Sequence, residues 1–148
     1  MKKYKFLIGG PTSSGKSDLA LCLARKYKGV IINADSMQLY KELRILTNRP
    51  SVDEMKKIDH KLYGKFCADQ ICSVERWRKL AINEIKKCEK KNQTSIIVGG
   101  SGLYLHSLIY GMAKIPDIPT SIKNRTRSLY KKIGPKRFFL DLAKKDRR

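Results

Sequence analysis

The fold of this chain is decided by the stretch Tyr4-Lys5-Phe6-Leu7-Ile8-Gly9-Gly10-Pro11-Thr12-Ser13-Ser14-Gly15-Lys16-Ser17. Residues 4–8 are a short apolar run typical of a buried strand, and residues 9–15 form a glycine-rich turn. Residues 16–27 continue with apolar side chains at helical spacing, which predicts a helix directly after the turn. Strand, glycine-rich turn and helix in this order predict a phosphate-binding P-loop at the start of a parallel sheet.

The P-loop contains each part that a phosphate grip requires. Glycine at positions 10 and 15 lets the backbone wrap closely around an anion, because a side chain there would collide with the ligand or forbid the required dihedral angles. Lys16 supplies a mobile positive charge, and the Ser17 hydroxyl is positioned to coordinate Mg²⁺. The expected diphosphate- or nucleotide-binding residues are Gly10, Pro11, Thr12, Ser13, Ser14, Gly15, Lys16 and Ser17.

The chain beyond the P-loop continues the same architecture. Gly29 is placed to end the first helix, and residues 30–34 and 95–98 form two further apolar strands. A helix between these strands is predicted by one apolar face, consisting of Val74, Trp77, Leu80, Ala81, Ile85 and Cys88. Another helix follows the glycine-rich turn at residues 99–102.

The expected domain organisation is therefore an α/β core in residues 1–113, of the P-loop NTPase type. Residues 41–75 lose the regular period and predict a small irregular or helical insertion. Three parallel strands are found, fewer than such sheets usually contain, so we expect the sheet to be incomplete. The basic segment 114–148 is expected to begin a second half.

Composition indicates a globular protein that binds a polyanion. Apolar residues make up 41% of the chain, and 33 Lys and Arg against 13 Asp and Glu give a net charge of +20. Such a charge favours nucleic acid as a partner, although a solvated lysine-rich surface would give the same composition. The four cysteines contain no CxxC pair, and the N-terminal apolar run is too short for a signal or a membrane span. We expect a cytoplasmic protein without a membrane segment.

Polar residues follow the second and third strands, whose carboxyl ends share one edge of a parallel sheet. Asp35 there can bind a metal-held water or take a proton from a nucleophile, or it can be an ordinary helix cap. Residues 99–102 are, on sequence alone, equally well a simple strand-to-helix turn with Ser101 as its N-cap.

Three blocks in order resemble the tRNA dimethylallyltransferase family. They are Gly10-Pro11-Thr12-Ser13-Ser14-Gly15-Lys16-Ser17, Ala34-Asp35-Ser36-Met37-Gln38-Leu39-Tyr40 and Val98-Gly99-Gly100-Ser101-Gly102-Leu103-Tyr104-Leu105. Residues 59–64, 73–78 and 115–119 are also similar, so the resemblance covers nearly all of the chain.

The resemblance implies that a dimethylallyl group passes from its diphosphate to the exocyclic amine of the adenosine 3′ to a tRNA anticodon. The P-loop would hold the diphosphate, with Lys16, Ser17 and Mg²⁺ stabilising the charge on the leaving group. Asp35 would be the general base for the flipped-out adenine. The implied tRNA contacts are Asp35, Ser36, Met37, Gln38, Ser101, where the family commonly has threonine, and Lys123, where it usually has arginine.

Basic side chains around the site would bind phosphates of the anticodon stem-loop, with Arg76, Arg78 and residues 123–137 as candidates. Family members are roughly twice as long as this chain. We therefore expect a monomer that is unstable, aggregation-prone or active only with a polypeptide supplying the remaining half. A small ATP-dependent P-loop kinase and a non-catalytic tRNA-binding remnant are the alternative functions.

Overall fold

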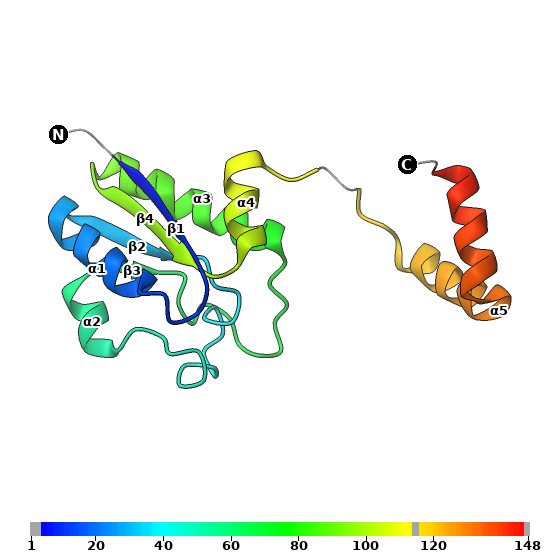
Figure 1. Cartoon of the computed structure of the whole chain (residues 1–148), viewed down its shortest axis with the longest axis horizontal. Helices are drawn as coiled ribbons and strands as arrows, with labels where there is room; N and C mark the ends of the chain where they lie inside the picture. The colour runs from blue at the N-terminus through cyan, green and yellow to red at the C-terminus, as the bar shows by residue number, and fades with distance from the viewer. Residues whose placement is uncertain (1–3, 114–115, 147–148) are drawn as a thin grey trace. The chain divides into compact units, whose positions relative to one another are not determined.

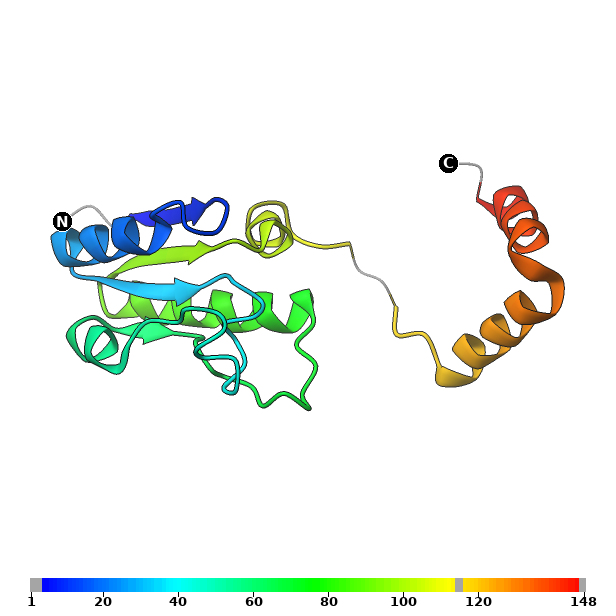
Figure 2. The same ribbon diagram turned by 60° about the horizontal axis from the view of Figure 1, so that its bottom comes forward.

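Four parallel strands form the sheet of this protein in the computed structural model, which describes residues 4–113 and 116–146. The strands are β1 (Lys5–Gly9), β2 (Gly29–Asn33), β3 (His60–Lys61) and β4 (Thr94–Gly99). Their order across the sheet is β1-β4-β2-β3, as Figures 1 and 2 show. The α/β fold with a parallel sheet is therefore confirmed, and its carboxyl edge carries the loops that follow β1, β2 and β4.

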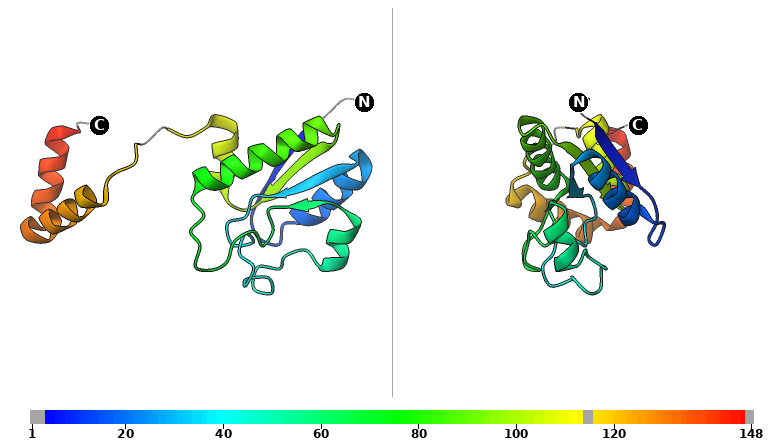
Figure 3. Two further views of the ribbon diagram at one scale, coloured as in Figure 1. Left: turned by 180° about the vertical axis from the view of Figure 1, so that it is seen from behind. Right: turned by 90° about the vertical axis from the view of Figure 1, so that its left-hand side faces the viewer.

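Helices cover both faces of the sheet. The helix α1 (Lys16–Tyr27) packs on one face, and α3 (Val74–Lys90) and α4 (Gly102–Tyr110) pack on the other, as the two views of Figure 3 show. A short helix, α2 (Val52–Lys57), lies within the insertion and begins with a capping box formed by Ser51 and Glu54. This arrangement buries the two central strands, β2 and β4, from both sides.

The alternation of strand side chains divides the core into two clusters. Val30, Ile32 and Ile97 face α3 and α4, while Ile31 and Ile96 face α1. On α3, Trp77 is fully buried, stacks on Tyr104 with ring centroids 4.3 Å apart, and donates its indole N–H to the Asn33 carbonyl (2.9 Å). The predicted apolar face of α3 is confirmed, since its six residues all belong to or pack against the cluster on this side. Trp77 thus holds the end of β2 from the face of the sheet that α3 covers.

Two expectations about the core were wrong. The sheet has a fourth strand, β3, which pairs with β2 through His60 and Lys61. A strand of two residues is too short to produce an apolar period. Gly29 does not end α1: Lys28 does so in the left-handed conformation (φ 48°), and Gly29 begins β2. A β-carbon at Gly29 would lie 2.8 Å from Ile96 Cδ1, so close strand packing explains this glycine.

The chain divides into two compact units, Met1–Met112 and Ala113–Arg148. The second unit contains α5 (Thr120–Lys145), which is broken by Gly134 (φ 77°, ψ 166°) followed by Pro135. None of the α5 side chains is buried, and Tyr130 and Phe138 pack edge to face across the break. The family-like block at 115–119 begins at Ile115, outside the described residues. Within the described part of the chain, no helix has both the length and the apolarity needed to cross a membrane.

The end of β4 approaches the end of β2 so closely that Gly99 has no room for a side chain. A β-carbon built on Gly99 would lie 2.1 Å from the Ala34 carbonyl carbon and 2.2 Å from its oxygen. The contact is to backbone, which cannot rotate away as a side chain can. Gly99 therefore sets the spacing between the loops after β2 and β4.

We expect Gly99→Ala to lower the free energy of unfolding by about 3 kcal/mol, because it forces the two strand ends apart. Gly102→Ala is the matched control, since a β-carbon on Gly102 meets no atom within 4 Å. Urea denaturation of both variants measures the difference. Equal stability of the two variants would contradict the close contact.

Candidate functional site

The loop between β1 and α1 is an exposed turn with two left-handed residues. Gly15 is left-handed (φ 77°) and so is Ser13 (φ 61°), which lets the chain turn into α1 at Lys16. The Ser14 hydroxyl donates to the Pro11 carbonyl (2.8 Å). The Lys16 ammonium group donates to the same carbonyl and lies 3.4 Å from the Ser14 hydroxyl. The Lys16 side chain thus folds back onto the loop, directly before the first turn of α1.

Different physical reasons account for the two P-loop glycines. At Gly15 a β-carbon would meet no atom within 4 Å, so the positive φ alone explains glycine there. At Gly10 a β-carbon would lie 3.1 Å from the Ser14 hydroxyl, so the loop is closed tightly around this position. The positive φ explains glycine at position 15, as the sequence predicts, and close packing explains glycine at position 10.

The Asp35 turn is fixed by Asn33, the last residue of β2. The Asn33 side chain is fully buried; it accepts from the Asp35 N–H (2.9 Å) and donates to the Asp35 carbonyl (2.9 Å). It also donates to the Leu62 carbonyl (3.1 Å) beyond β3. One amide group thereby holds the backbone of the turn and ties it to the neighbouring loop.

The Asp35 carboxylate organises a turn and caps no helix. Its Oδ1 accepts from the N–H of Met37 (2.9 Å) and of Gln38 (3.4 Å), and the next helix begins only at Val52. The helix-cap interpretation is therefore wrong. The second oxygen, Oδ2, faces the P-loop side of the sheet edge, as its position beside Gly100 shows.

Gly100 locates Asp35 against the P-loop. A β-carbon on Gly100 would lie 3.6 Å from the Gly10 carbonyl oxygen and 3.7 Å from Asp35 Oδ2. The loops after β1, β2 and β4 therefore meet at one point of the carboxyl edge. These loops carry the three sequence blocks that suggested a common site.

Ser101 joins the loops after β2 and β4 directly. It stands at the N-cap position of α4 but makes no side-chain cap hydrogen bond. Its hydroxyl instead accepts from the Ser36 N–H (2.9 Å) and donates to the Ser36 hydroxyl (3.3 Å). The predicted N-cap position is thus correct, but the hydroxyl makes no capping bond and instead positions the residue that follows Asp35.

Gln38 and Arg49 connect the turn to the insertion. The Gln38 side chain donates to the Thr47 carbonyl (2.8 Å), and the Gln38 backbone carbonyl accepts from the Gly64 N–H (2.9 Å). The Arg49 guanidinium lies flat against Gly64, where a β-carbon would be 2.3 Å from Nη1, and donates to the Tyr40 carbonyl (3.1 Å). Met37, by contrast, is 52% exposed. The turn therefore has a fixed backbone and an accessible outer side chain.

A cavity of about 170 Å³ lies beside the P-loop helix, and Ser17, Asn48, Arg49, His60 and Tyr63 are among its lining residues. Burial, followed by the negative charge of Asp35, raises the pKa of the Tyr63 hydroxyl. Burial, reinforced by Arg44, lowers the pKa of Arg49. The Arg49 Nε is buried without a hydrogen-bond partner among the described residues.

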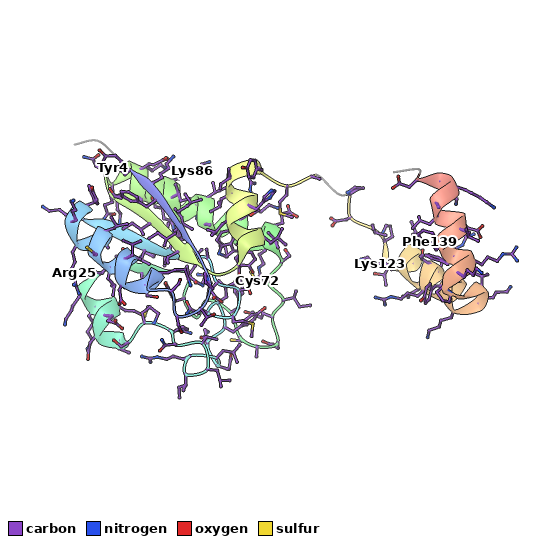
Figure 4. All side chains as sticks on the ribbon, in the orientation of Figure 1. Tyr4, Arg25, Cys72, Lys86, Lys123 and Phe139 are labelled. Carbon is purple, nitrogen blue, oxygen red and sulfur yellow. The ribbon has the colours of Figure 1, made fainter. Side chains whose placement is uncertain are left out.

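The basic side chains that the sequence predicts to contact tRNA differ in their surroundings. Arg78 donates to the Ser107 carbonyl near the end of α4 (2.8 Å), and Arg76 donates to the Ile71 carbonyl (3.0 Å) and lies over the Phe66 ring. Both guanidinium groups thus have partners within the chain. Lys123, labelled in Figure 4, lies on α5 and belongs to the second unit, whereas Asp35, Ser36, Ser101 and Gly10 belong to the first.

Sequence reasoning missed Asn33 and Arg49. A polar residue at the end of an otherwise apolar strand was a usable signal for Asn33, because buried amides need partners. Arg49 carried no such signal, since its role depends on contacts with residues 40 and 64. Among the described residues, no group of three or more His, Cys, Asp or Glu could hold a metal ion alone.

Comparisons with known proteins give a consistent result. The model of the IPP transferase family matches residues 38–148. A tRNA dimethylallyltransferase of Pelagibacter ubique is 49% identical over 140 residues, covering 95% of this chain and 45% of that protein, and one of Rhodospirillum centenum is 44% identical with the same coverage. The chain thus spans about 45% of the length of these curated relatives.

Solved structures agree with the sequence matches. A eukaryotic dimethylallyltransferase acting on tRNA superimposes with a TM-score of 0.81 at 26% identity, covering 97% of this chain and 36% of that one. A tRNA isopentenylpyrophosphate transferase of Staphylococcus epidermidis gives 0.71 at 33% identity, covering 89% of this chain and 42% of that one.

We expect Asn33→Asp to lower the free energy of unfolding by about 3 kcal/mol, because a buried carboxylate would face the carbonyls of Asp35 and Leu62 with no donor to offer. Asn83→Asp, on the exposed side of α3, should change it by less than about 0.5 kcal/mol. Urea titration of both variants gives the two values. A loss of stability at position 33 no larger than that at position 83 would contradict the role of the Asn33 amide in holding the turn.

Proposed function

This chain belongs to the IPP transferase family, and from that premise we propose that it takes part in transferring a dimethylallyl group from dimethylallyl diphosphate to tRNA. The acceptor is the exocyclic amine of the adenosine 3′ to the anticodon, and diphosphate is released. One observation carries the proposal: Gly100 lies close to both the Gly10 carbonyl and the Asp35 carboxylate, since a β-carbon on it would be 3.6 Å from the one and 3.7 Å from the other. In the proposed reaction Asp35 is the base and the P-loop holds the diphosphate, and the proximity of the two loops supports these roles.

In the proposed reaction the carbon–oxygen bond to diphosphate breaks and a carbon–nitrogen bond to the adenine amine forms. The amides of residues 10–15 and the Lys16 ammonium hold the diphosphate and balance its growing charge. Lys16, which donates to the loop's own Pro11 carbonyl, exchanges this partner for phosphate oxygens. Asp35 accepts the amine proton through the carboxylate oxygen on the P-loop side, while its other oxygen holds the turn.

The residues after Asp35 are suited to contact the base. The backbone of Ser36 is fixed by Ser101, and that of Gln38 by Gly64, whereas the Met37 side chain is exposed. We assign Ser36, Met37 and Gln38 to the flipped adenosine, and Ser101 and Lys123 to the tRNA. The net charge of +20 favours such a partner, and we place the reaction in the cytoplasm.

The donor set fits Mg²⁺. Ser17 offers a hydroxyl oxygen at the start of α1, and Mg²⁺ typically keeps several waters and takes one or two protein ligands together with substrate phosphates. A dedicated cluster of carboxylates is therefore not needed. When bound, the ion would neutralise charge on the departing diphosphate.

The proposal predicts that the protein, incubated with Mg²⁺, radiolabelled dimethylallyl diphosphate and unmodified tRNA, puts label into the tRNA. Asp35→Asn should reduce the rate by at least about 100-fold, because the amide cannot accept the proton. Filter-bound counts against time measure both rates. Absence of label with folded wild-type protein, or full activity in the variant, would refute the assignment.

Ligand binding separates the prenyl diphosphate site from an ATP site. Dimethylallyl diphosphate at about 100 times its Kd should stabilise the fold by about 2.7 kcal/mol, and ATP should not. Lys16→Met should abolish the gain, whereas Lys90→Met, at the end of α3, should keep it. Thermal unfolding with each nucleotide or diphosphate measures the shift. Protection by ATP alone would favour the kinase alternative.

A further inference from the structure

The backbone that follows the Asp35 turn is held by a short row of hydrogen bonds. The carbonyl of Gln38 accepts from the Gly64 N–H (2.9 Å), and the carbonyl of Leu39 accepts from the Phe66 N–H (3.0 Å). Two successive carbonyls are thus held by backbone donors from the loop after β3. This pairing fixes the course of the chain that leads away from the carboxylate.

Arg49, from the insertion, supplies the next donor in this row. Its guanidinium group donates through Nη1 to the carbonyl of Tyr40 (3.1 Å). The same group lies against Gly64, so closely that a β-carbon on this glycine would collide with Cζ and with both terminal nitrogens of the guanidinium. Arg49 therefore contacts both of the paired segments with one rigid, planar group.

The position of this guanidinium group is unfavourable in other respects. Its Nε is buried without a hydrogen-bond partner among the described residues. Within the same part of the chain, no carboxylate forms an ion pair with Arg49. Because a partly buried cation with an unused donor costs folding free energy, stability alone does not account for an arginine here.

The amides that orient the Asp35 carboxylate belong to the segment that Arg49 holds. Oδ1 of Asp35 accepts from the N–H of Met37 (2.9 Å) and of Gln38 (3.4 Å). The carbonyl of Gln38 is also the first acceptor in the row that ends at Arg49. A movement of this segment would therefore displace the donors that hold the carboxylate.

We propose that Arg49 is a positioning residue for Asp35, holding the chain after the Asp35 turn so that the carboxylate keeps its place beside Gly100. The inference rests on the proposed function for the role of Asp35 as the base. It adds that a side chain of the insertion determines whether this base is correctly placed. Arg49 acts through the backbone and takes no part in the proton transfer.

Amide hydrogen exchange, followed by NMR on the purified chain, tests the proposal without any prenyl transfer. In Arg49→Met the N–H groups of Met37 and Gln38 should exchange at least about ten-fold faster than in the unsubstituted protein, because the segment that carries them is released. The amides of β4 should keep their exchange rates. A variant that only destabilised the fold would accelerate exchange in this central strand as well.

Two further variants serve as controls. Arg49→Lys keeps a donor for the Tyr40 carbonyl, so it should return the exchange of Met37 and Gln38 to within about three-fold of the unsubstituted protein. Arg44→Met makes the same chemical change at an exposed arginine of the same insertion. It should leave both exchange rates unchanged.

Prenyl transfer provides a second measurement. Arg49→Met should lower kcat at least about ten-fold and leave the KM for dimethylallyl diphosphate within about two-fold, because the P-loop is not altered. If the unsubstituted chain transfers no prenyl group, the proposed function fails, and the exchange measurement still decides the role of Arg49.

Unchanged exchange of Met37 and Gln38 in Arg49→Met would overturn the proposal. So would an equal acceleration throughout β4, which would make Arg49 a residue of general stability. Arg49→Lys behaving as Arg49→Met would also contradict it, because the bond to the Tyr40 carbonyl would then not hold the segment. A raised KM with an unchanged kcat would assign Arg49 to substrate binding instead.

Discussion

The contact on which the site depends is the one between the carboxyl ends of β2 and β4. Gly99 lies against the Ala34 carbonyl with no space for a side chain, and the Ser101 N–H donates to the same carbonyl (3.2 Å). The Ala34 N–H donates in turn to Val98 (2.7 Å). With the two backbones held at this distance, Asp35, Gly100 and Ser101 have little freedom, so the geometry of the Asp35 turn follows from a packing constraint.

Beneath this contact, polar groups are satisfied by a small buried network. Asn33 holds the Asp35 backbone, and Trp77 donates to the carbonyl of Asn33 itself. Tyr104 stacks on Trp77, and burial raises the pKa of its hydroxyl to about 12. The buried side chains beneath the Asp35 turn are thus neutral groups held by hydrogen bonds.

The sequence predicts the features that local chemistry determines and misses those that depend on distant contacts. The P-loop, the first helix and the apolar face of α3 are visible because glycine spacing and a 3.6-residue period are local signals. The strand β3 was missed since two residues carry no period, and Gly29 was misassigned because its reason is the side chain of Ile96 across the sheet. The bond from Ser101 to Ser36 spans 65 positions and has no local signature.

The strand order has a consequence for how the protein is made. In the described part of the chain, β1 is hydrogen-bonded to β4 and to no other strand, although some 85 residues separate them. During synthesis, β1 therefore has no partner strand until residues 94–99 have left the ribosome. By then α1 and β2 have already been made and can pack against each other. During that interval the glycine-rich turn is not yet held beside the Asp35 turn, because β4 is the strand that joins β1 to β2.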